Sequence, residues 1–203
     1  ACEGIDQCGG PLLGTSGVTL AQESAAPAAE PKPWDTCVSC HGADGNSVNP
    51  IWPKLAGQGA PYIAKQLHDF KGGRRADPLM SGMAMAVPDD KVDEVAAYFA
   101  GQAAQPAAPV KPELVEQGKQ LYVAGNPATG ITACAACHGP NGNGNAAASF
   151  PALGAQHAAY TIKQLQMFRD GSRANDPNQM MRDIAARLTE QEIEALAMYL
   201  STL

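Results

Sequence analysis

Two copies of one five-residue motif constrain this chain more than any other feature of its sequence. Cys-x-x-Cys-His occupies residues 37–41 and again residues 134–138. Two thiols one helical turn apart can each form a thioether with a haem vinyl group, and the adjacent histidine can then bind the iron. The repeat therefore predicts two covalently bound haem c groups, held by Cys37, Cys40 and His41 and by Cys134, Cys137 and His138.

Other uses of paired cysteines fit the sequence less well. A zinc ribbon has about 15–20 residues between its two Cys-x-x-Cys pairs. The interval from Cys40 to Cys134 is much longer, as expected for motifs in two separate domains. A thioredoxin-type pair lies in a βαβ pattern, and the chain has no convincing strand run. Structural disulfides would not need the adjacent histidines, so haem attachment accounts best for the complete motif.

The two halves of the chain resemble each other. Residues 53–76 and 151–174 share 12 identities in 24 positions at a constant shift of 98. Beyond this block the shift becomes 101, which pairs Met80 with Met181. Self-similarity of this kind indicates a gene duplication and fixes the domain plan. The predicted parts are a flexible N-terminal extension (1–33), a first domain (34–101), a Pro/Ala linker (102–111) and a second domain (112–203).

The sequence predicts an all-α fold. Helical periodicity covers residues 61–71 and 158–170, and a further helix near 112–123 has a proline in its first turn. Thr189 and Glu192 have the spacing of a capping box at the start of the last helix. The last helix of each half has one apolar face, formed by Val92, Val95, Ala96 and Phe99 and by Ile193, Leu196, Ala197 and Leu200.

A haem that transfers electrons needs a second axial ligand, and methionine raises its potential relative to a second histidine. Met80 and Met181 both lie 18 residues before a helix tyrosine, in segments that we expect to be irregular. We predict this pair as ligands and keep Met83 and Met180 as alternatives, because flexible methionines leave the register ambiguous. His68 and His157 are not equivalent in the repeat, so we expect polar or hydrogen-bonding roles for them.

The charge distribution argues against nucleic acid as a partner. The net charge is −6, and each predicted domain carries six Lys/Arg against eight Asp/Glu. An acidic surface favours basic or dipolar docking partners. No segment has the ~18 apolar residues that a membrane span needs. Because haem c is attached outside the cytoplasm, we expect a periplasmic protein.

Residues 1–33 allow three interpretations that the sequence leaves open. Residues 19–21 resemble a signal-peptidase site, but the upstream stretch lacks a basic start and a long apolar run. Ala1-Cys2 could belong to a lipidation motif whose other residues are missing, and Cys2 and Cys8 could form a local disulfide. Membrane association through this extension therefore stays open.

From residue 34 to residue 203 the chain resembles the cytochrome c4 family of di-haem electron carriers. The stretches that carry the resemblance are Asp44-Gly-Asn-Ser47, Pro53-Lys-Leu-Ala-Gly-Gln58, Met80-Ser-Gly-Met83, Phe150-Pro-Ala-Leu153, Gln156-His-Ala-Ala-Tyr160, Lys163-Gln-Leu165, Asn175-Asp176 and Met181-Arg182. The resemblance implies two class I cytochrome c folds with haems facing each other through their propionate edges. It also implies iron ligation by Met80 and Met181 and hydrogen bonds from the proximal histidines to the carbonyls of Pro53 and Pro151.

The first half departs from this family pattern at its start. Such domains usually begin with a helix that packs on the last helix, and the second half keeps one. Residues 25–33 of the first half are instead rich in alanine and proline and cannot make a long helix. We expect Trp34 to supply the missing packing.

These features predict an electron carrier rather than an enzyme, because no nucleophile, acid–base pair or substrate pocket is visible. The expected partners are a quinol-oxidising complex and a terminal oxidase of a respiratory chain. The alternative is a cytochrome subunit of a flavin- or quinone-dependent dehydrogenase. A di-haem peroxidase or thiosulfate-oxidising cytochrome ranks third, because it would need an open or unusually ligated iron.

Overall fold

The computed structural model describes residues 30–203, in which helices, short 3₁₀ turns and loops occur with two isolated β-bridges but no strand. This confirms the all-α prediction. The first half contains α1 (Asp35–His41), α2 (Ala60–Lys71), α3 (Met80–Met85), η1 (Asp89–Lys91) and α4 (Val92–Ala100). The second half contains η2 (Pro112–Leu114), α5 (Val115–Ala124), α6 (Ala135–His138), α7 (Ala158–Arg169), η3 (Pro177–Gln179), α8 (Met180–Ala185) and α9 (Glu190–Ser201).

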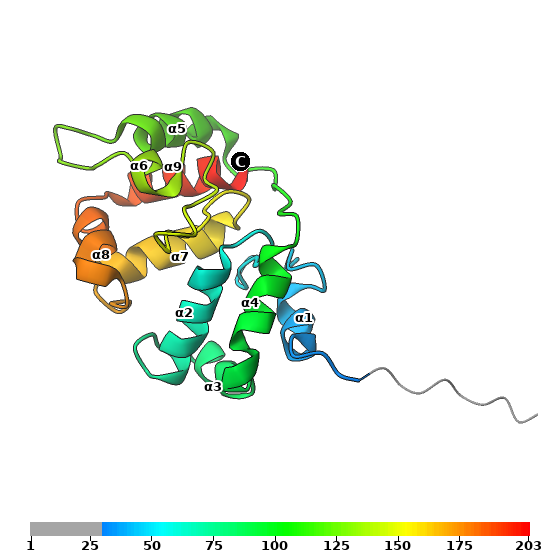
Figure 1. The fold of residues 1–203 in the computed structure, drawn as a ribbon. Coiled ribbons are helices and arrows are strands. Elements are labelled where there is room, and N and C mark those ends of the chain that lie inside the picture. The colour runs from blue at the N-terminus through cyan, green and yellow to red at the C-terminus, as the bar shows by residue number, and fades with distance from the viewer. Residues whose placement is uncertain (1–29) are drawn as a thin grey trace, which may run out of the picture. The chain divides into compact units, whose positions relative to one another are not determined.

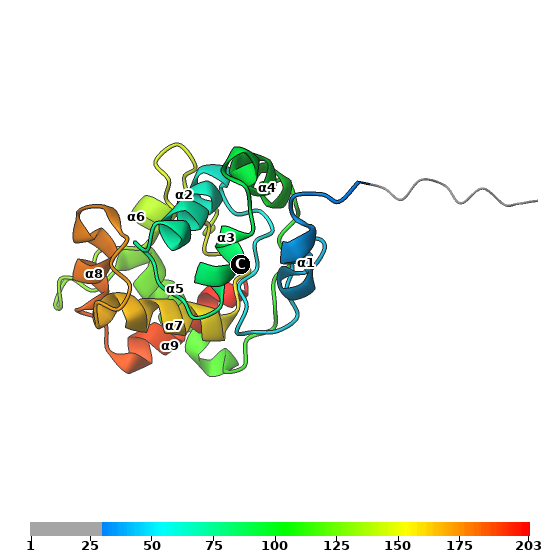
Figure 2. The same ribbon diagram turned by 90° about the horizontal axis from the view of Figure 1, so that it is seen from below.

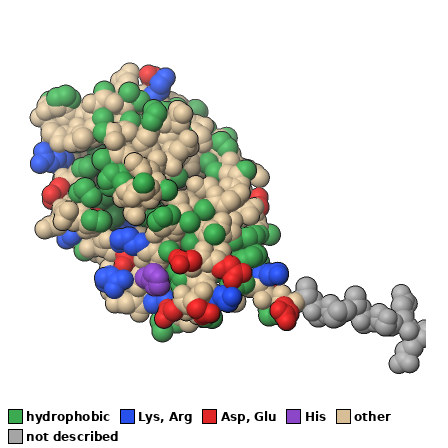
Figure 3. Space-filling view, viewed as in Figure 1, with side chains coloured by type: hydrophobic (Ala, Val, Ile, Leu, Met, Phe, Trp, Pro, Cys, Tyr) green, Lys and Arg blue, Asp and Glu red, His purple; other side chains and the backbone are tan. Residues whose placement is uncertain are grey.

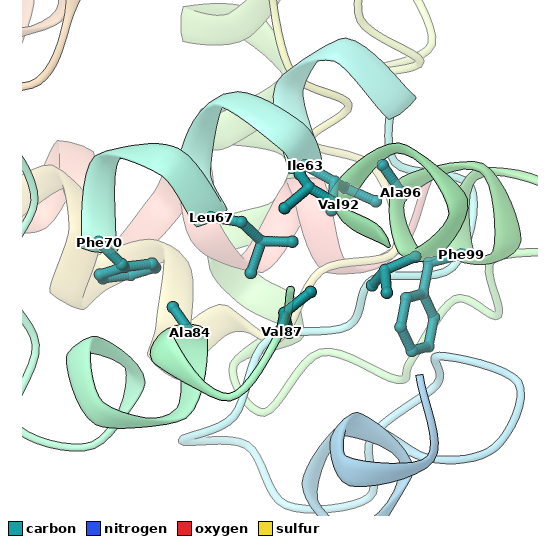
Figure 4. Close-up of a cluster of buried hydrophobic side chains, with 9 residues drawn as sticks. Ile63, Leu67, Phe70, Ala84, Val87, Val92, Ala96 and Phe99 are labelled. Atoms are coloured by element: carbon teal, nitrogen blue, oxygen red, sulfur yellow. The ribbon is translucent and has the colours of Figure 1, made fainter. Parts of the chain in front are cut away.

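The core of the first half lies where α2 packs against α3 and α4 (Figure 1). Ile63, Leu67 and Phe70 recur at helical spacing on one face of α2, and Phe99 of α4 is fully buried. Figure 4 shows these side chains converging with Val92 and Ala96 of α4 and with Ala84 and Val87. Each of the buried valine, leucine, isoleucine and phenylalanine side chains stabilises the fold by about 1.5–3 kcal/mol through burial. The predicted apolar face of the last helix is therefore confirmed.

The second half is built around α9, which packs against α5 and runs along α7 (Figures 1 and 2). The predicted capping box starts this helix: Glu192 N–H donates to Thr189 Oγ1 over 3.2 Å, and Thr189 N–H donates to the Glu192 carboxylate over 2.9 Å. The four residues of the predicted apolar face are buried: Ile193, Leu196, Ala197 and Leu200.

The two halves begin differently. In the second half, α5 crosses α9 so closely that a Cβ on Gly118 would lie 2.0 Å from the carbonyl oxygen of Ala195. In the first half, Trp34 stacks on Tyr98 of α4, with ring centroids 4.0 Å apart and planes 7° from parallel. This confirms that Trp34 supplies packing that a helix supplies in the second half.

The segments that carry Met80 and Met181 are more regular than the sequence predicts. Met80 begins α3 and Met181 lies in α8, so the expectation of irregular segments is wrong. Aspartates make these short helices possible. Asp77 Oδ1 accepts the Met80 N–H over 3.1 Å, and Asp176 Oδ2 accepts the Met181 N–H over 3.0 Å. Such capping satisfies amides that the first helical turn leaves free.

The predicted boundaries of the extension, domains and linker stay predictions. Between the end of α4 and the start of η2 the chain has no helix. Residues 1–29, including Cys2, Cys8 and the site at 19–21, lie outside the described residues. Over residues 30–203, none of the helices has the length and apolar character needed to cross a membrane.

Candidate haem-binding site

A continuous cavity of about 790 Å³ brings the predicted site residues of both halves together. Its wall includes the two cysteine pairs, both motif histidines and both predicted methionine ligands: Cys37, Cys40, His41 and Met80, with Cys134, Cys137, His138 and Met181. Core side chains of both halves form much of the remaining wall, among them Leu67, Phe70 and Leu196. The cavity is therefore an apolar space with sulfur and imidazole donors at defined places.

The two motif histidines are oriented in the same way. His41 Nδ1 lies 2.8 Å from the carbonyl oxygen of Pro53, and His138 Nδ1 lies 2.9 Å from that of Pro151. A carbonyl oxygen can only accept, so Nδ1 carries the proton and Nε2 keeps its lone pair. Both rings are buried, and this burial lowers the pKa of both histidines. Each ring is therefore a neutral imidazole with Nε2 available to a metal.

The methionines divide into those that line the cavity and those that do not. Met80, Met83, Met180 and Met181 all line the cavity. Met80 and Met181 are half-buried, whereas Met83 and Met180 are 36% and 37% exposed. Met85, Met167 and Met198 are absent from its wall. Burial thus favours Met80 and Met181, and their role as ligands stays a prediction.

This donor set fits haem c. Among the described residues the four motif cysteines form no disulfide, so their sulfur atoms are available for thioether bonds to haem. The family model for cytochrome c matches residues 32–102 and 115–203. Cytochrome c4 of Thiocapsa roseopersicina is 52% identical over 192 residues, which cover 91% of this chain and 99% of that protein. The chain belongs to the cytochrome c4 family.

Two further relatives extend this comparison. The crystal structure of reduced recombinant cytochrome c4 from Pseudomonas stutzeri is 44% identical, with a TM-score of 0.80, and the match covers 84% of this chain and 94% of that one. A protein of Stutzerimonas stutzeri named thiosulfate dehydrogenase electron acceptor is 41% identical over 166 residues, covering 80% of this chain and 76% of that protein. As a cytochrome c4, this chain is a di-haem electron-transfer protein with two cytochrome c domains and covalently bound haem c.

Two buried arginines of this cytochrome c4 were not predicted as site residues. Arg75 and Arg173 line the cavity and are 7% and 5% exposed. In the described residues their guanidinium groups donate only to neutral oxygens, those of Tyr62, Tyr160, Gln66, Gln164 and Asn175. The repeat contained the signal, because the arginines, tyrosines and glutamines are pairwise identities at the shift of 98.

The two remaining histidines take the polar roles expected from the sequence. His68 is exposed on α2, and no cavity-lining role is found for it. His157 Nε2 lies 2.8 Å from the carbonyl oxygen of Ser47 and 2.9 Å from its hydroxyl oxygen. His157 thereby joins the second half to the loop that follows the first haem motif.

Proposed function

We propose that this cytochrome c4 carries electrons in the periplasm from a quinol-oxidising complex to a terminal oxidase of a respiratory chain. The observation that carries the proposal is the continuous cavity, which reaches both cysteine pairs and both candidate methionines. Two redox centres in one continuous cavity can exchange an electron within the protein before it leaves. Haem, when bound, supplies a one-electron iron couple at each centre.

The chain's own residues set the properties of these centres. His41 and Met80 would ligate one iron, and His138 and Met181 the other. The carbonyls of Pro53 and Pro151 hold the imidazoles in the tautomer that ligates, which is a common function of groups behind a metal ligand. Methionine on the opposite face favours a higher potential than a second histidine.

The buried arginines support haem binding with the carboxylate edges toward the domain interface. A buried guanidinium without an anionic partner is costly, whereas a carboxylate at hydrogen-bond distance would offset its charge. Arg75 and Arg173 line the cavity, and each bonds to residues of both halves. Haem propionates placed beside them would complete the charge balance of the interface.

A second function has support from a relative reported above. The Stutzerimonas stutzeri protein is named as an electron acceptor of thiosulfate dehydrogenase. By analogy, this chain could accept electrons directly from a dehydrogenase instead of from a quinol-oxidising complex. The redox centres would be the same, and only the donor would differ.

Stopped-flow kinetics with the holoprotein distinguish these functions. We expect the reduced protein to be oxidised rapidly by membranes that contain a terminal oxidase, and the oxidised protein to be reduced by a quinol-oxidising complex. The rates should depend only weakly on salt, because charges of both signs lie close together on the face that Figure 3 shows. Rapid reduction by a dehydrogenase with no turnover by the membrane complexes would favour the second function.

A further inference from the structure

Gln156 of the second half contacts the peptide group that holds the proximal histidine of the first half. The Lys54 N–H donates to Gln156 Oε1 over 2.9 Å, and Gln156 Nε2 donates to the Lys54 carbonyl over 3.0 Å. The Lys54 N–H belongs to the same peptide unit as the Pro53 carbonyl, which accepts the proton of His41 Nδ1 over 2.8 Å. A chain of two hydrogen bonds therefore runs from His41 through one peptide group to Gln156.

The same arrangement links Gln58 of the first half to the proximal histidine of the second half. The Ala152 N–H donates to Gln58 Oε1 over 2.8 Å, and Gln58 Nε2 donates to the Ala152 carbonyl over 2.9 Å. The peptide unit of this N–H carries the Pro151 carbonyl, which accepts from His138 Nδ1 over 2.9 Å. Gln58 and Gln156 are identical residues at equivalent positions of the repeat. The two chains of hydrogen bonds are therefore equivalent, and each crosses between the halves.

The orientation of each glutamine amide follows from its other contacts. Gln156 Oε1 also accepts the N–H of His157 over 3.0 Å, and Gln58 Oε1 accepts the N–H of Gly59 over 3.0 Å. A rotated amide would place its NH₂ group against two N–H donors and its oxygen against a carbonyl. Only the orientation in which Oε1 faces the N–H of Lys54 or of Ala152 gives each donor an acceptor.

Hydrogen bonds in such a chain polarise one another. An acceptor at the N–H of a peptide makes its carbonyl oxygen more negative, which strengthens the next bond by roughly 10–30%. The stronger acceptor draws the Nδ1 proton of the histidine and raises the basicity of the ring as a ligand. A more basic ligand stabilises ferric iron over ferrous iron and so lowers the potential.

We propose that Gln58 and Gln156 are positioning residues that act across the domain interface, each setting the proximal histidine and the potential of the haem in the other half. The inference rests on the proposed ligation by His41 and His138. It gives the interface a defined role beyond holding the halves together. A change in domain contact that moves these glutamines would alter both potentials through the two peptides.

The test uses the holoprotein and the variants Gln156→Leu and Gln58→Leu, which keep side-chain volume and remove the amide. The potential of each haem is followed by NMR during a redox titration, with the haem methyl signals assigned through contacts to their own cysteines. We expect Gln156→Leu to shift the reduction equilibrium of the haem at Cys37 about threefold toward the reduced form, which corresponds to about 28 mV for one electron. Gln58→Leu should do the same to the haem at Cys134.

His157→Ala is the matched control, because it removes a contact between the halves without touching either peptide. We expect it to leave both potentials within about 10 mV of the unmodified protein, less than a twofold change in equilibrium. The proposal is overturned if each glutamine variant shifts the haem of its own half, if neither shifts any haem, or if His157→Ala causes the same shifts.

Amide hydrogen exchange provides a second readout that does not depend on the potentials. In the reduced unmodified protein we expect the amides of Lys54 and Ala152 to be protected. Gln156→Leu should accelerate exchange at Lys54 alone, and Gln58→Leu at Ala152 alone. Rapid exchange of both amides in the unmodified protein would contradict the proposal. Failure of histidine ligation is recognised separately, by the loss of hyperfine-shifted histidine ring signals in the unmodified ferric protein.

Discussion

Arg173 Nη2 donates a hydrogen bond to the Tyr62 hydroxyl over 2.8 Å, and this contact joins the two halves of the protein. Its counterpart in the repeat is the 2.9 Å bond from Arg75 Nη2 to the Tyr160 hydroxyl. Burial alone would raise the pKa of Tyr62, but the positive charges of Arg173 and Arg75 outweigh it and lower that pKa. The two guanidinium groups thus impose a positive potential on the interface between the halves.

Replacing Arg173 with methionine should weaken this interface. The variant removes a buried cation that bonds to four side chains, so we expect a loss of about 3 kcal/mol in the free energy of unfolding. Loss of the positive charge should also lower both haem potentials. Urea unfolding and redox titration check the two effects. Arg169→Met, which removes an ion pair with the exposed Glu190, is the control and should cost less than about 1 kcal/mol.

Each predicted methionine ligand should account for one half of the methionine–iron signal. Ferric haem with methionine ligation has a weak absorption band at the red end of the visible spectrum. We expect Met80→Ala and Met181→Ala each to remove half of this band and to lower the potential of one haem. Met83→Ala and Met180→Ala are the controls and should retain the full band. A halved band in either control instead would show that the assigned register is wrong.

Acid should weaken the contact that Asp69 makes with the second half. Its carboxylate accepts from Lys65 and Arg74 and, across the interface, from Asn175 over 2.7 Å. Burial opposes ionisation, but these hydrogen bonds outweigh it and hold the pKa of Asp69 below its ordinary value. The unfolded chain therefore binds the proton more readily than the folded protein. The ionised Asp69 carboxylate stabilises the folded state above about pH 4, and this contribution is lost as the pH falls through the folded-state pKa.

Urea unfolding at neutral pH and at pH values below 4 measures this effect. Asp69→Asn should be less stable than the unmodified protein at neutral pH, and its stability should fall less on acidification. Asp90→Asn changes an exposed carboxylate and should leave the acid dependence unaltered. Equal acid sensitivity of the Asp69→Asn variant and the unmodified protein would refute the role given to Asp69.

Gly118→Ala tests the close crossing of α5 and α9. The added Cβ would meet the Ala195 carbonyl oxygen at 2.0 Å and its carbon at 2.6 Å, so backbone must move. We expect a destabilisation of about 1–3 kcal/mol, the usual cost of overpacking. Gly101→Ala is the control, because its nearest neighbour would lie at 3.5 Å. If thermal unfolding of the two variants is the same, the helices do not approach as described.

Strong local patterns made much of the fold predictable. The expected helices at 61–71 and 158–170 match α2 and α7 within one residue, since the spacing of their apolar residues indicates them. The expected helix at 112–123 begins as a 3₁₀ turn and becomes α5 at Val115. The haem motifs were equally clear, because their chemistry requires fixed spacing.

The remaining features depend on contacts that periodicity does not encode. The second half has three extra residues before its candidate ligand. In this longer segment Asn178 and Gln179 adopt left-handed backbone, with φ of 51° and 60°. This geometry lets a helix begin at Met180, which the sequence pattern did not indicate. Likewise, Arg75 and Arg173 were visible as repeat identities, but only the folded chain brings each to the glutamines of both halves.

We expect both haems of this protein to be electron-transfer centres with histidine and methionine ligands. A redox titration of the holoprotein, followed by absorption across the visible spectrum and at the methionine–iron band, tests it most directly. We expect two one-electron steps, with each step removing an equal share of that band as iron is reduced. A band that accounts for only one haem, or a second centre that binds exogenous ligands in the ferric state, would contradict it.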